Sequence, residues 1–394
     1  MGSFGHPTIR TLNLDRMAFE GIRLTSFYAA PSCSPSRAAL LTGRYPVRSG
    51  ISRVLGPDSD RGLPPSEVTL AERLKSRNYR TVAIGKWHLG TEEEYLPTSN
   101  GFDEYFGLLY SNDMQPPWVQ TERPLKLYRN SEPVGYPVNQ ATLTERYTEE
   151  AIKFIRDAQD QPFFLYLPYT MPHVPISVSE RFAGQSRNGL YGDVIETIDW
   201  SVGQILQALK QEGLDENTLV VFTSDNGPWL NMPERMFGEG IVKPWHAGSP
   251  GPLRGWKGTT YEGGMRVPFI ARWPNRIPAG QTSAEPTSVM DLYATFLSLA
   301  GAQIPQDRPV DGRDITPLLT EGAASPHQAL YYFSGELLEG VREGPWKLRI
   351  ARDSALELFN LEVDPSERYN LAGQNPEIVT RLRSRMEAFA EELP

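Results

Sequence analysis

Four short stretches of the chain consist almost wholly of apolar and β-branched residues, without alternating polar positions. They lie at 81–84, 162–167, 218–223 and 267–271. Such runs are typical of strands that are covered on both faces, as in a parallel sheet. Apolar residues at helical spacing predict amphipathic helices at 144–158 and 193–212. The alternation of strands and helices predicts an α/β fold with a mixed, mostly parallel sheet sandwiched by helices.

The pattern of apolar positions changes toward the C-terminus. Three shorter apolar segments are typical of antiparallel strands and lie at 329–333, 346–350 and 356–360. An amphipathic helix is predicted at about 376–392. We therefore predict a larger unit over 1–325 and a small C-terminal α+β unit with an antiparallel sheet over 326–394.

Two long segments, 111–140 and 227–255, show little periodicity and are rich in Gly, Pro and Trp. Irregular segments of this length usually shape a functional site. We expect a hairpin in the first segment, around 130–133. Four tryptophans are candidates either for stacking on an aryl ring or sugar face or for anchoring these loops: Trp118, Trp229, Trp245 and Trp256.

Composition and charge narrow the classes of function. The 394 residues carry a formal net charge of −9, so the overall field opposes binding to nucleic acid or to an anionic membrane surface. No apolar run approaches the roughly 20 residues of a membrane-spanning helix. Cys33 is the single cysteine, which excludes an intramolecular disulfide and a zinc cluster of thiolates. We expect no nucleic-acid partner and no membrane partner.

Cys33 stands where a helix is predicted to begin. It opens the sequence Cys-Ser-Pro-Ser-Arg, and good helix formers follow Pro35. The amide groups at a helix N-terminus favour a bound anion and the anionic form of a nucleophile. Arg37 and Arg44 add positive charge. The residues alone therefore indicate an anion-binding site that contains a nucleophile.

Five motifs, in order along nearly the whole chain, carry a resemblance to one family. They are Cys-Ser-Pro-Ser-Arg at 33–37 with Leu-Thr-Gly-Arg at 41–44, Gly-Lys-Trp-His-Leu-Gly at 85–90, Ser-Asp-Asn-Gly at 224–227, Lys-Gly-Thr-Thr-Tyr-Glu-Gly-Gly at 257–264, and Asp-Pro-Ser-Glu at 364–367 with Asn-Leu at 370–371. The set resembles the sulfatases of the alkaline phosphatase superfamily, and most closely enzymes of the arylsulfatase A type. The resemblance implies an alkaline phosphatase-like fold with 1–325 as the catalytic domain.

The resemblance also implies an activity, that of a sulfuric-ester hydrolase acting on aryl or sugar sulfates. In the family a formylglycine-generating enzyme oxidises the motif cysteine to formylglycine, and the hydrated aldehyde attacks the sulfur atom. Cys33 would then be the precursor of the nucleophile, with Ser36 and Arg37 beside it. The partners that this implies are a small-molecule sulfate ester and the maturing enzyme.

Lys86 and His88 follow the predicted strand that ends near Ile84. In an extended segment, residues two apart share one face, here at the carboxyl end of a strand, where open α/β sheets bind ligands. By the resemblance, Lys86 steadies the nucleophile and the sulfate. His88 then takes a proton from the hydrate.

Three further positions match the family pattern. His173, in Pro-His-Val-Pro, matches a second active-site histidine that binds sulfate and protonates the leaving oxygen. Lys257 matches the lysine that neutralises charge on the bridging oxygen. Ser111 matches a position that donates a hydrogen bond to sulfate.

Asp225 and Asn226 follow the predicted strand at 218–223 and offer the oxygen ligands that calcium and magnesium prefer. By the resemblance, this pair shares a calcium ion with two adjacent aspartates on a first sheet strand. No Asp-Asp pair occurs in the sequence. We therefore expect weak or incomplete binding of the divalent cation, an open sheet edge and impaired activity.

Two other functions stay open at this point. A hydrolase of phosphate or phosphonate esters from the same superfamily would use the same charges. A non-catalytic protein of the same fold would keep only anion binding, and the incomplete set of metal ligands motivates that alternative. Matched sulfate and phosphate esters test the first alternative, and metal content tests the second.

The sequence also allows expectations about the cellular compartment and the oligomeric state of the protein. The beginning of the chain shows no basic and apolar signal region. As the chain stands we expect a cytoplasmic protein, and with a longer N-terminus a periplasmic or secreted one. An unpaired sheet edge is compatible with a homodimer.

Overall fold

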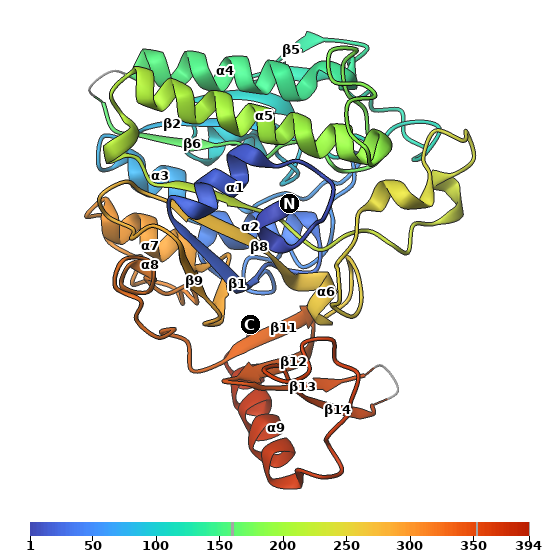
Figure 1. The fold of residues 1–394 in the computed structure, drawn as a ribbon, viewed down its shortest axis with the longest axis vertical. Coiled ribbons are helices and arrows are strands. Elements are labelled where there is room, and N and C mark those ends of the chain that lie inside the picture. Colours follow the sequence, from blue (N-terminus) through green and yellow to red (C-terminus); the bar gives the residue numbers. More distant parts are fainter. Residues whose placement is uncertain (159–160, 352–353, 394) are drawn as a thin grey trace.

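The structure, a computed structural model, describes residues 1–158, 161–351 and 354–393. Within these residues three sheets form the framework of the protein (Figure 1). Two sheets have five strands each and lie among helices, and the third has four strands and is built from the C-terminal part of the chain. The predicted α/β class with a mixed sheet is confirmed.

The first five-stranded sheet is mixed, because β8 (Arg266–Arg272) runs antiparallel to both of its neighbours, β1 (Ile22–Tyr28) and β7 (Val220–Thr223). The short strands β9 (Gln281–Ser283) and β10 (Thr287–Ser288) pair with β1 in parallel. The apolar runs predicted β7 and β8, whereas β1 carries no such run and was not predicted.

The second five-stranded sheet is centred on β2 (Arg80–Lys86). This strand is flanked in parallel by β3 (Glu104–Leu108) and β6 (Phe163–Tyr166). Beyond β3 the sheet continues with β4 (Leu127–Arg129) and β5 (Glu132–Gly135), which form the predicted hairpin and run antiparallel.

Helices cover both faces of the sheets. The long helices α4 (Leu143–Ala158) and α5 (Gly189–Gln211) pack against each other and, with α1 (Leu12–Phe19), against β2 and β8. α3 (Leu70–Lys75) packs against β2 and against α7 (Asp291–Leu299), and α2, described below, packs against α3 and α7. The helix α8 (Thr316–Glu321) follows α7 along the chain.

Two adjacent phenylalanines of β6 show that these helix layers lie on opposite faces. Phe163 meets Phe154 of α4 with ring centroids 5.8 Å apart, and Phe164 meets Phe296 of α7 at 6.3 Å. Successive side chains of a strand point to opposite faces. The sheet is therefore sandwiched by helices, as the sequence predicted.

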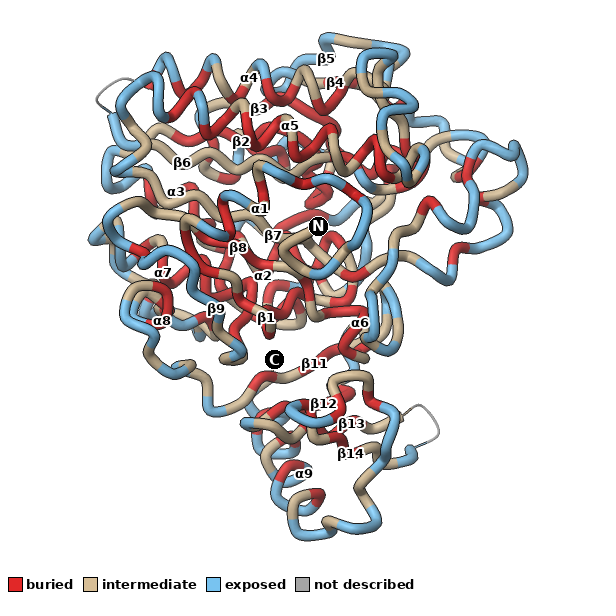
Figure 2. The backbone as a smooth tube through the Cα atoms, in the orientation of Figure 1, coloured by how far each residue is buried: buried red, intermediate tan, exposed pale blue. Residues whose placement is uncertain are grey.

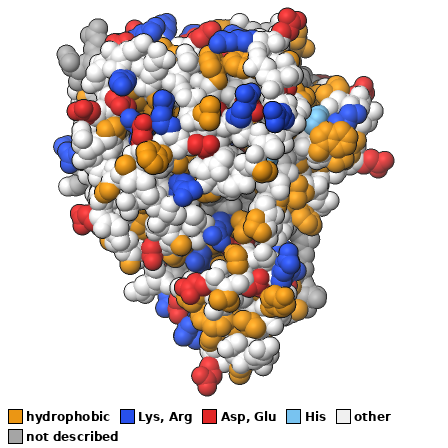
Figure 3. All heavy atoms as spheres, viewed as in Figure 1, with side chains coloured by type: hydrophobic (Ala, Val, Ile, Leu, Met, Phe, Trp, Pro, Cys, Tyr) orange, Lys and Arg blue, Asp and Glu red, His pale blue; other side chains and the backbone are white. Residues whose placement is uncertain are grey.

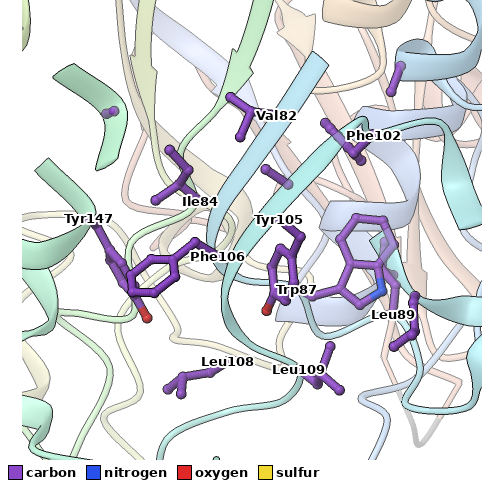
Figure 4. Close-up of a cluster of buried hydrophobic side chains, with 14 of the residues drawn as sticks. Val82, Ile84, Trp87, Leu89, Phe102, Tyr105, Phe106, Leu108, Leu109 and Tyr147 are labelled. Atoms are coloured by element: carbon purple, nitrogen blue, oxygen red, sulfur yellow. The ribbon is translucent and has the colours of Figure 1, made fainter. Parts of the chain in front are cut away.

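The largest apolar cluster packs around β2 and β3 and beneath α4 and α5 (Figure 2, Figure 4). Trp87 meets Phe102 edge to face with ring centroids 5.9 Å apart, and Phe106 meets Tyr147 in the same way at 6.2 Å. Such ring pairs contribute about 0.5–1.5 kcal/mol beyond the area they bury. Because Trp87 is fully buried directly after β2, this core fixes the segment that carries the candidate residues on either side of it.

β6 and β7 are the outermost strands of their sheets, and neither edge is paired with a further strand among the described residues. All four residues of each strand are partly exposed, whereas β2 beside β6 is almost completely buried. Helices cover their faces, but one edge of each strand is open. The open sheet edge expected from the sequence is thus present at two strands.

The third sheet is an antiparallel meander of β11 (Leu330–Ser334), β12 (Leu337–Glu343), β13 (Trp346–Ile350) and β14 (Leu356–Asn360). α9 (Pro376–Glu391) packs on β12 and β13. The sequence pattern predicted three of these strands and the helix, but not β12. The division of the chain after residue 325 stays a prediction.

The surface of the protein mixes charges of both signs. Figure 3 shows Lys and Arg side chains interspersed with Asp and Glu over one face, not gathered into a single patch. Of the helices in the described part of the chain, none combines the length and the apolar character that crossing a bilayer requires.

Candidate active site

Cys33 is the first residue of α2 (Cys33–Thr42) and is buried. Ser32 precedes it in an extended conformation, and the amide of Ser36 donates to the Ser32 carbonyl at 3.1 Å, which closes the first turn. The Ser36 hydroxyl donates to the carbonyl of Ala30 at 3.0 Å and so holds the entering segment against the helix. The predicted helix N-terminus is confirmed, and its dipole favours negative charge beside Cys33.

Arg37, one turn along α2, links three elements of the site. Its guanidinium donates to the backbone carbonyl of Lys86 at the end of β2 and to Asp225 Oδ2, 2.8 Å away, in the loop after β7. Arg37 is almost fully buried, and its Nε has no partner among the described residues. The same side chain therefore fixes the geometry of the site and leaves one buried donor unused.

Lys86 lies at the end of β2, where its ammonium donates to Ser111 Oγ at 3.1 Å. The preceding Gly85 has φ of +130°, and a Cβ there would lie 2.1 Å from the carbonyl oxygen of Pro168. Only glycine allows this close approach of β2 to the segment after β6. Burial, with a contribution from Arg37, lowers the pKa of Lys86.

His88 has φ of +63°, so the chain is not extended there, and the extended geometry predicted beyond Lys86 is wrong. A non-glycine residue in the left-handed region is uncommon and concentrates at functional sites. His88 is buried, its Nε2 lies 2.9 Å from the carbonyl oxygen of Leu55, and its Nδ1 has no partner among the described residues. Burial and the nearby cations lower the pKa of His88 well below 6.5, so the ring is neutral.

His173 and Lys257 form the more open side of the site. His173 Nε2 lies 3.0 Å from the Lys257 ammonium, and its Nδ1 lies 2.8 Å from the carbonyl oxygen of Val174 and 3.4 Å from Ser111 Oγ. Cys33 also lies close enough to Lys257 to raise the pKa of its ammonium. Burial and the charge of Lys257 lower the pKa of His173 well below 6.5. A neutral imidazole nitrogen therefore accepts the Lys257 hydrogen bond.

The charges in the site are unbalanced toward positive. Burial alone would raise the pKa of Asp225, but the field of Arg37, with Lys86 and Lys257, lowers it to about 2. For Lys257 burial acts against the charged form, yet Cys33 and Asp225 raise its pKa overall. Three cations thus face the cysteine, the Asp225 carboxylate and the buried side chain of Asp113, which also raises the pKa of Lys257. An oxyanion ligand would complete this arrangement.

The predicted metal ligands do not complete a calcium site. The Asp225 carboxylate is engaged with Arg37, and Asn226 has a buried Oδ1 without a partner among the described residues. Within the described chain no group of three or more His, Cys, Asp or Glu side chains is placed to hold a metal ion. Calcium takes six to eight oxygen ligands, so these two side chains fit the chemistry of the ion but not its coordination number.

The structure brings together residues that the motifs did not mark. Asp113 is buried with an oxygen 3.7 Å from His173 Nδ1, and Trp229 has its ring centroid 5.6 Å from that of His173 and 5.0 Å from the Lys257 ammonium. The feature of the sequence that could have marked Asp113 as a site residue is its position two residues after Ser111. The sequence marked Trp229 as a candidate for stacking or for anchoring a loop, and its cation–π contact with Lys257 depends on a fold that the sequence pattern does not specify.

The two irregular segments share one apolar cluster with the segment after β6 and with α5. Trp118, buried, lies in this cluster with Met232, Met236 and Val242 from the segment 227–255. Trp118 is therefore a loop anchor, whereas Trp245 and Trp256 are exposed. The second segment projects from the body of the molecule and is drawn in yellow in Figure 1.

Comparison with solved structures identifies the fold class. A sulfatase from Pseudoalteromonas sp. superposes with a TM-score of 0.87 at 31% sequence identity, over 100% of this chain and 88% of that chain. The architecture is therefore that of the alkaline phosphatase-like sulfatases, as predicted.

Comparison of sequences identifies the family. The Sulfatase family model matches residues 1–302, and a model described as N-sulphoglucosamine sulphohydrolase, C-terminal, matches residues 255–392. The chain belongs to the sulfatase family. N-acetylgalactosamine-6-sulfatase of Rattus norvegicus is 40% identical over 95% of this chain and 73% of the relative, and steryl-sulfatase of Homo sapiens is 37% identical over 87% and 71%. The predicted enzyme class, a sulfuric-ester hydrolase, is confirmed.

Proposed function

We propose that this sulfatase hydrolyses aryl or sugar sulfate esters at the site built around Cys33. The observation that carries the proposal is that buried Cys33 stands at a helix N-terminus, in a site whose cations are Arg37, Lys86 and Lys257. A tetrahedral anion bound there would offset the excess positive charge of cations that are already buried in the site. The relatives named for sugar and steryl sulfates support the ester class and leave the alcohol part open.

Position 33 fits the formylglycine that the family uses. The cysteine stands in Cys-Ser-Pro-Ser-Arg, at the N-terminal end of a helix, and lies near enough to Lys257 to raise the pKa of that lysine. When present, formylglycine supplies a hydrated aldehyde as the nucleophile toward sulfur. A formylglycine-generating enzyme is accordingly a proposed partner for maturation.

The chain's own residues divide the remaining work between the two sides of the site. Lys86, Arg37 and Lys257 offset the charge of the sulfate oxygens, with Ser111 as a further donor. His88 is neutral and buried with a free Nδ1, so it can accept a proton.

His173 faces the more open side and is proposed as the acid for the leaving oxygen. Its imidazole is neutral, because burial and the Lys257 charge lower its pKa. A sulfate ester brings negative charge beside the ring, which raises the pKa of the imidazole and favours uptake of the proton that the leaving oxygen needs.

We propose that Asp225 and Asn226 supply the described part of a calcium or magnesium site. Binding through one carboxylate already paired with Arg37 and one amide oxygen is expected to be weak. The homodimer remains a proposal that rests on the open edges of β6 and β7.

The test is turnover of 4-nitrophenyl sulfate by protein co-produced with a formylglycine-generating enzyme, with and without added calcium. Cys33→Ala is the blank, and 4-nitrophenyl phosphate is the matched ester. Sulfate turnover that disappears in Cys33→Ala supports the proposal, and a calcium response adds a working metal site. Faster phosphate turnover would favour the phosphate-ester alternative, and folded protein with no turnover above the blank would favour the non-catalytic one.

A further inference from the structure

The segment 255–264, here termed the Lys257 loop, touches both the candidate site and the C-terminal sheet. On the site side, the Lys257 amide donates to the carbonyl of Pro228 at 2.9 Å and the Gly258 amide donates to Pro31 at 2.7 Å, two residues before Cys33. The loop ends in the short helix α6 (Glu262–Met265). Its position therefore sets where the Lys257 ammonium lies relative to Cys33 and His173.

The far end of the Lys257 loop is fixed by a fully buried group of charges. Lys347 of β13 lies 2.9 Å from Glu262 Oε1 and 2.9 Å from Glu367 Oε1. Glu367 Oε2 also accepts the backbone amide of Glu262 at 2.7 Å. All three side chains are completely buried. Burial would raise the pKa of Glu262, but Lys347, with Arg266 and Arg342, lowers it overall, so its carboxylate is charged.

A second buried group holds the middle of the same loop. Arg349 of β13 donates to Thr260 Oγ1 at 2.7 Å, and the Thr260 hydroxyl donates to Glu339 of β12 at 2.6 Å. The Tyr261 hydroxyl donates to the carboxylate of Glu357 on β14 at 2.9 Å. Strands β12, β13 and β14 thus each contribute a charged side chain to a ten-residue loop that they do not neighbour in sequence.

The motif Asp-Pro-Ser-Glu at 364–367, which received no chemical role from the sequence, takes part in this arrangement. Asp364 Oδ2 accepts the amides of Arg368 and Tyr369 at 2.8 and 2.9 Å and so closes a turn. Glu367 stands in this turn with φ of +52°, a strained conformation for a non-glycine residue. The turn aims its carboxylate at Lys347 and at the start of α6.

We propose that Lys347 and Glu367 are positioning residues that set the location of the Lys257 ammonium, and through it the protonation of His173. The proposal rests on the proposed function, because the position of Lys257 affects activity only if this site hydrolyses sulfate esters. The buried contacts are long-range and include the ion pair of Lys347 with Glu262. They therefore tie the loop to the C-terminal sheet, in addition to the backbone hydrogen bonds that join Lys257 and Gly258 to Pro228 and Pro31. The C-terminal sheet is then a part of the active site that never touches the substrate.

The test reads the position of Lys257 through His173 and needs no turnover. The protein has five histidines, so ring-labelled histidine allows each NMR titration to be followed and assigned by substitution. Lys257→Met gives the His173 midpoint without the ammonium. We expect Lys347→Met to raise the His173 midpoint by about one pH unit, toward the Lys257→Met value. Lys347→Arg, which keeps the charge, should stay near the wild-type midpoint.

Glu343→Gln is the matched control, since Glu343 pairs with Arg381 and Arg385 of α9 and, among the described residues, makes no hydrogen bond or ion pair with the Lys257 loop. It should lower stability and leave the His173 midpoint unchanged. A wild-type midpoint in folded Lys347→Met would overturn the proposal, as would an unchanged midpoint in Lys257→Met. If Lys347→Met does not fold, Tyr261→Phe loosens the same loop more gently, and an unshifted His173 there overturns the proposal.

If the proposed function is wrong but the positioning role is right, the histidine titrations and the turnover measurements give different answers. Shifted His173 midpoints in protein that never turns over sulfate support the positioning role and remove the catalytic one. Where turnover is measurable, mispositioned Lys257 should lower kcat for 4-nitrophenyl sulfate more than it raises KM, because charge on the leaving oxygen develops in the transition state.

Discussion

The two sides of the candidate site are built in different ways. Asp225 and Asn226 follow β7, a strand with an open edge whose residues are partly exposed. Lys257 lies in a loop that buried charges of the C-terminal sheet fix from the far side. Packed, long-range contacts thus specify the cationic side, whereas the side with Asp225 and Asn226 follows an edge strand. The two sides of one site therefore differ in how much of the surrounding fold holds them in place.

The largest effect is expected when a buried charge that holds the Lys257 loop is removed. Lys347→Met removes the only described cation that pairs with both Glu262 and Glu367, and breaking such a buried pair costs about 3–5 kcal/mol. Urea unfolding should report that loss in the free energy of unfolding. Glu343→Gln, at a partly exposed pair in the same subdomain, should cost less than about 1 kcal/mol. Equal effects would contradict a special role for the buried group.

Removing the ammonium that this group positions should mainly affect chemistry. Lys257→Met is expected to lower kcat/KM for 4-nitrophenyl sulfate by about 100- to 1,000-fold, the effect of losing one preorganised charge-stabilising donor. Steady-state kinetics on the matured enzyme measure it. Lys210→Met, at an exposed lysine of α5, serves as control and should leave kcat/KM unchanged.

The open edge can be tested by a matched pair of core truncations in adjacent strands. Phe269→Ala, at a fully buried position of β8, should cost about 3–5 kcal/mol of unfolding free energy. Phe222→Ala in partly exposed β7, which pairs with β8, should cost roughly half as much because less apolar area returns to water. Equal losses in chemical denaturation would show that β7 is covered in solution.

Acid should weaken the fold through the two site histidines. The pKa values of His88 and His173 lie well below 6.5 in the folded protein, so below pH 6.5 the unfolded chain binds more protons. The free energy of unfolding therefore falls as pH decreases through 6.5, by up to about 1.4 kcal/mol per pH unit for each histidine, and this effect is absent above it. Denaturation curves between about pH 5 and 8 measure the slope. The double variant His88→Gln/His173→Gln should flatten it, and an unchanged slope would assign the acid sensitivity elsewhere.

The elements that were predicted from the sequence have simple patterns, and those that were missed do not. β2, β7 and β8 are short apolar runs, and α4 and α5 have clear apolar stripes. β1 mixes polar and apolar residues, and β12 hides its buried positions because Glu339 and Arg342 are inside. Hydrophobic patterns treat charged residues as exposed. Because β12 buries charged side chains, and one of them, Glu339, helps to hold the Lys257 loop, the pattern could not predict this strand.

The candidate site shows the same limit. The motifs marked Cys33, Arg37 and Lys257, and the structure brings these side chains together. They could not mark Trp229 or Asp113, whose places depend on how two irregular segments fold. The sequence likewise gave no sign that His88 has a left-handed backbone, since spacing alone implied an extended one.

The contact between Glu262 and Glu367 joins residues 105 positions apart. During synthesis, when chains fold from the N-terminal end as they emerge, α2 and β2 leave the ribosome long before Glu367 exists. The Lys257 loop beside Cys33 is therefore fixed only after Glu367 has emerged, later than the elements that hold the rest of the site. Until then Cys33 stands beside a loop that is not yet held, which would leave it accessible to the formylglycine-generating enzyme proposed above.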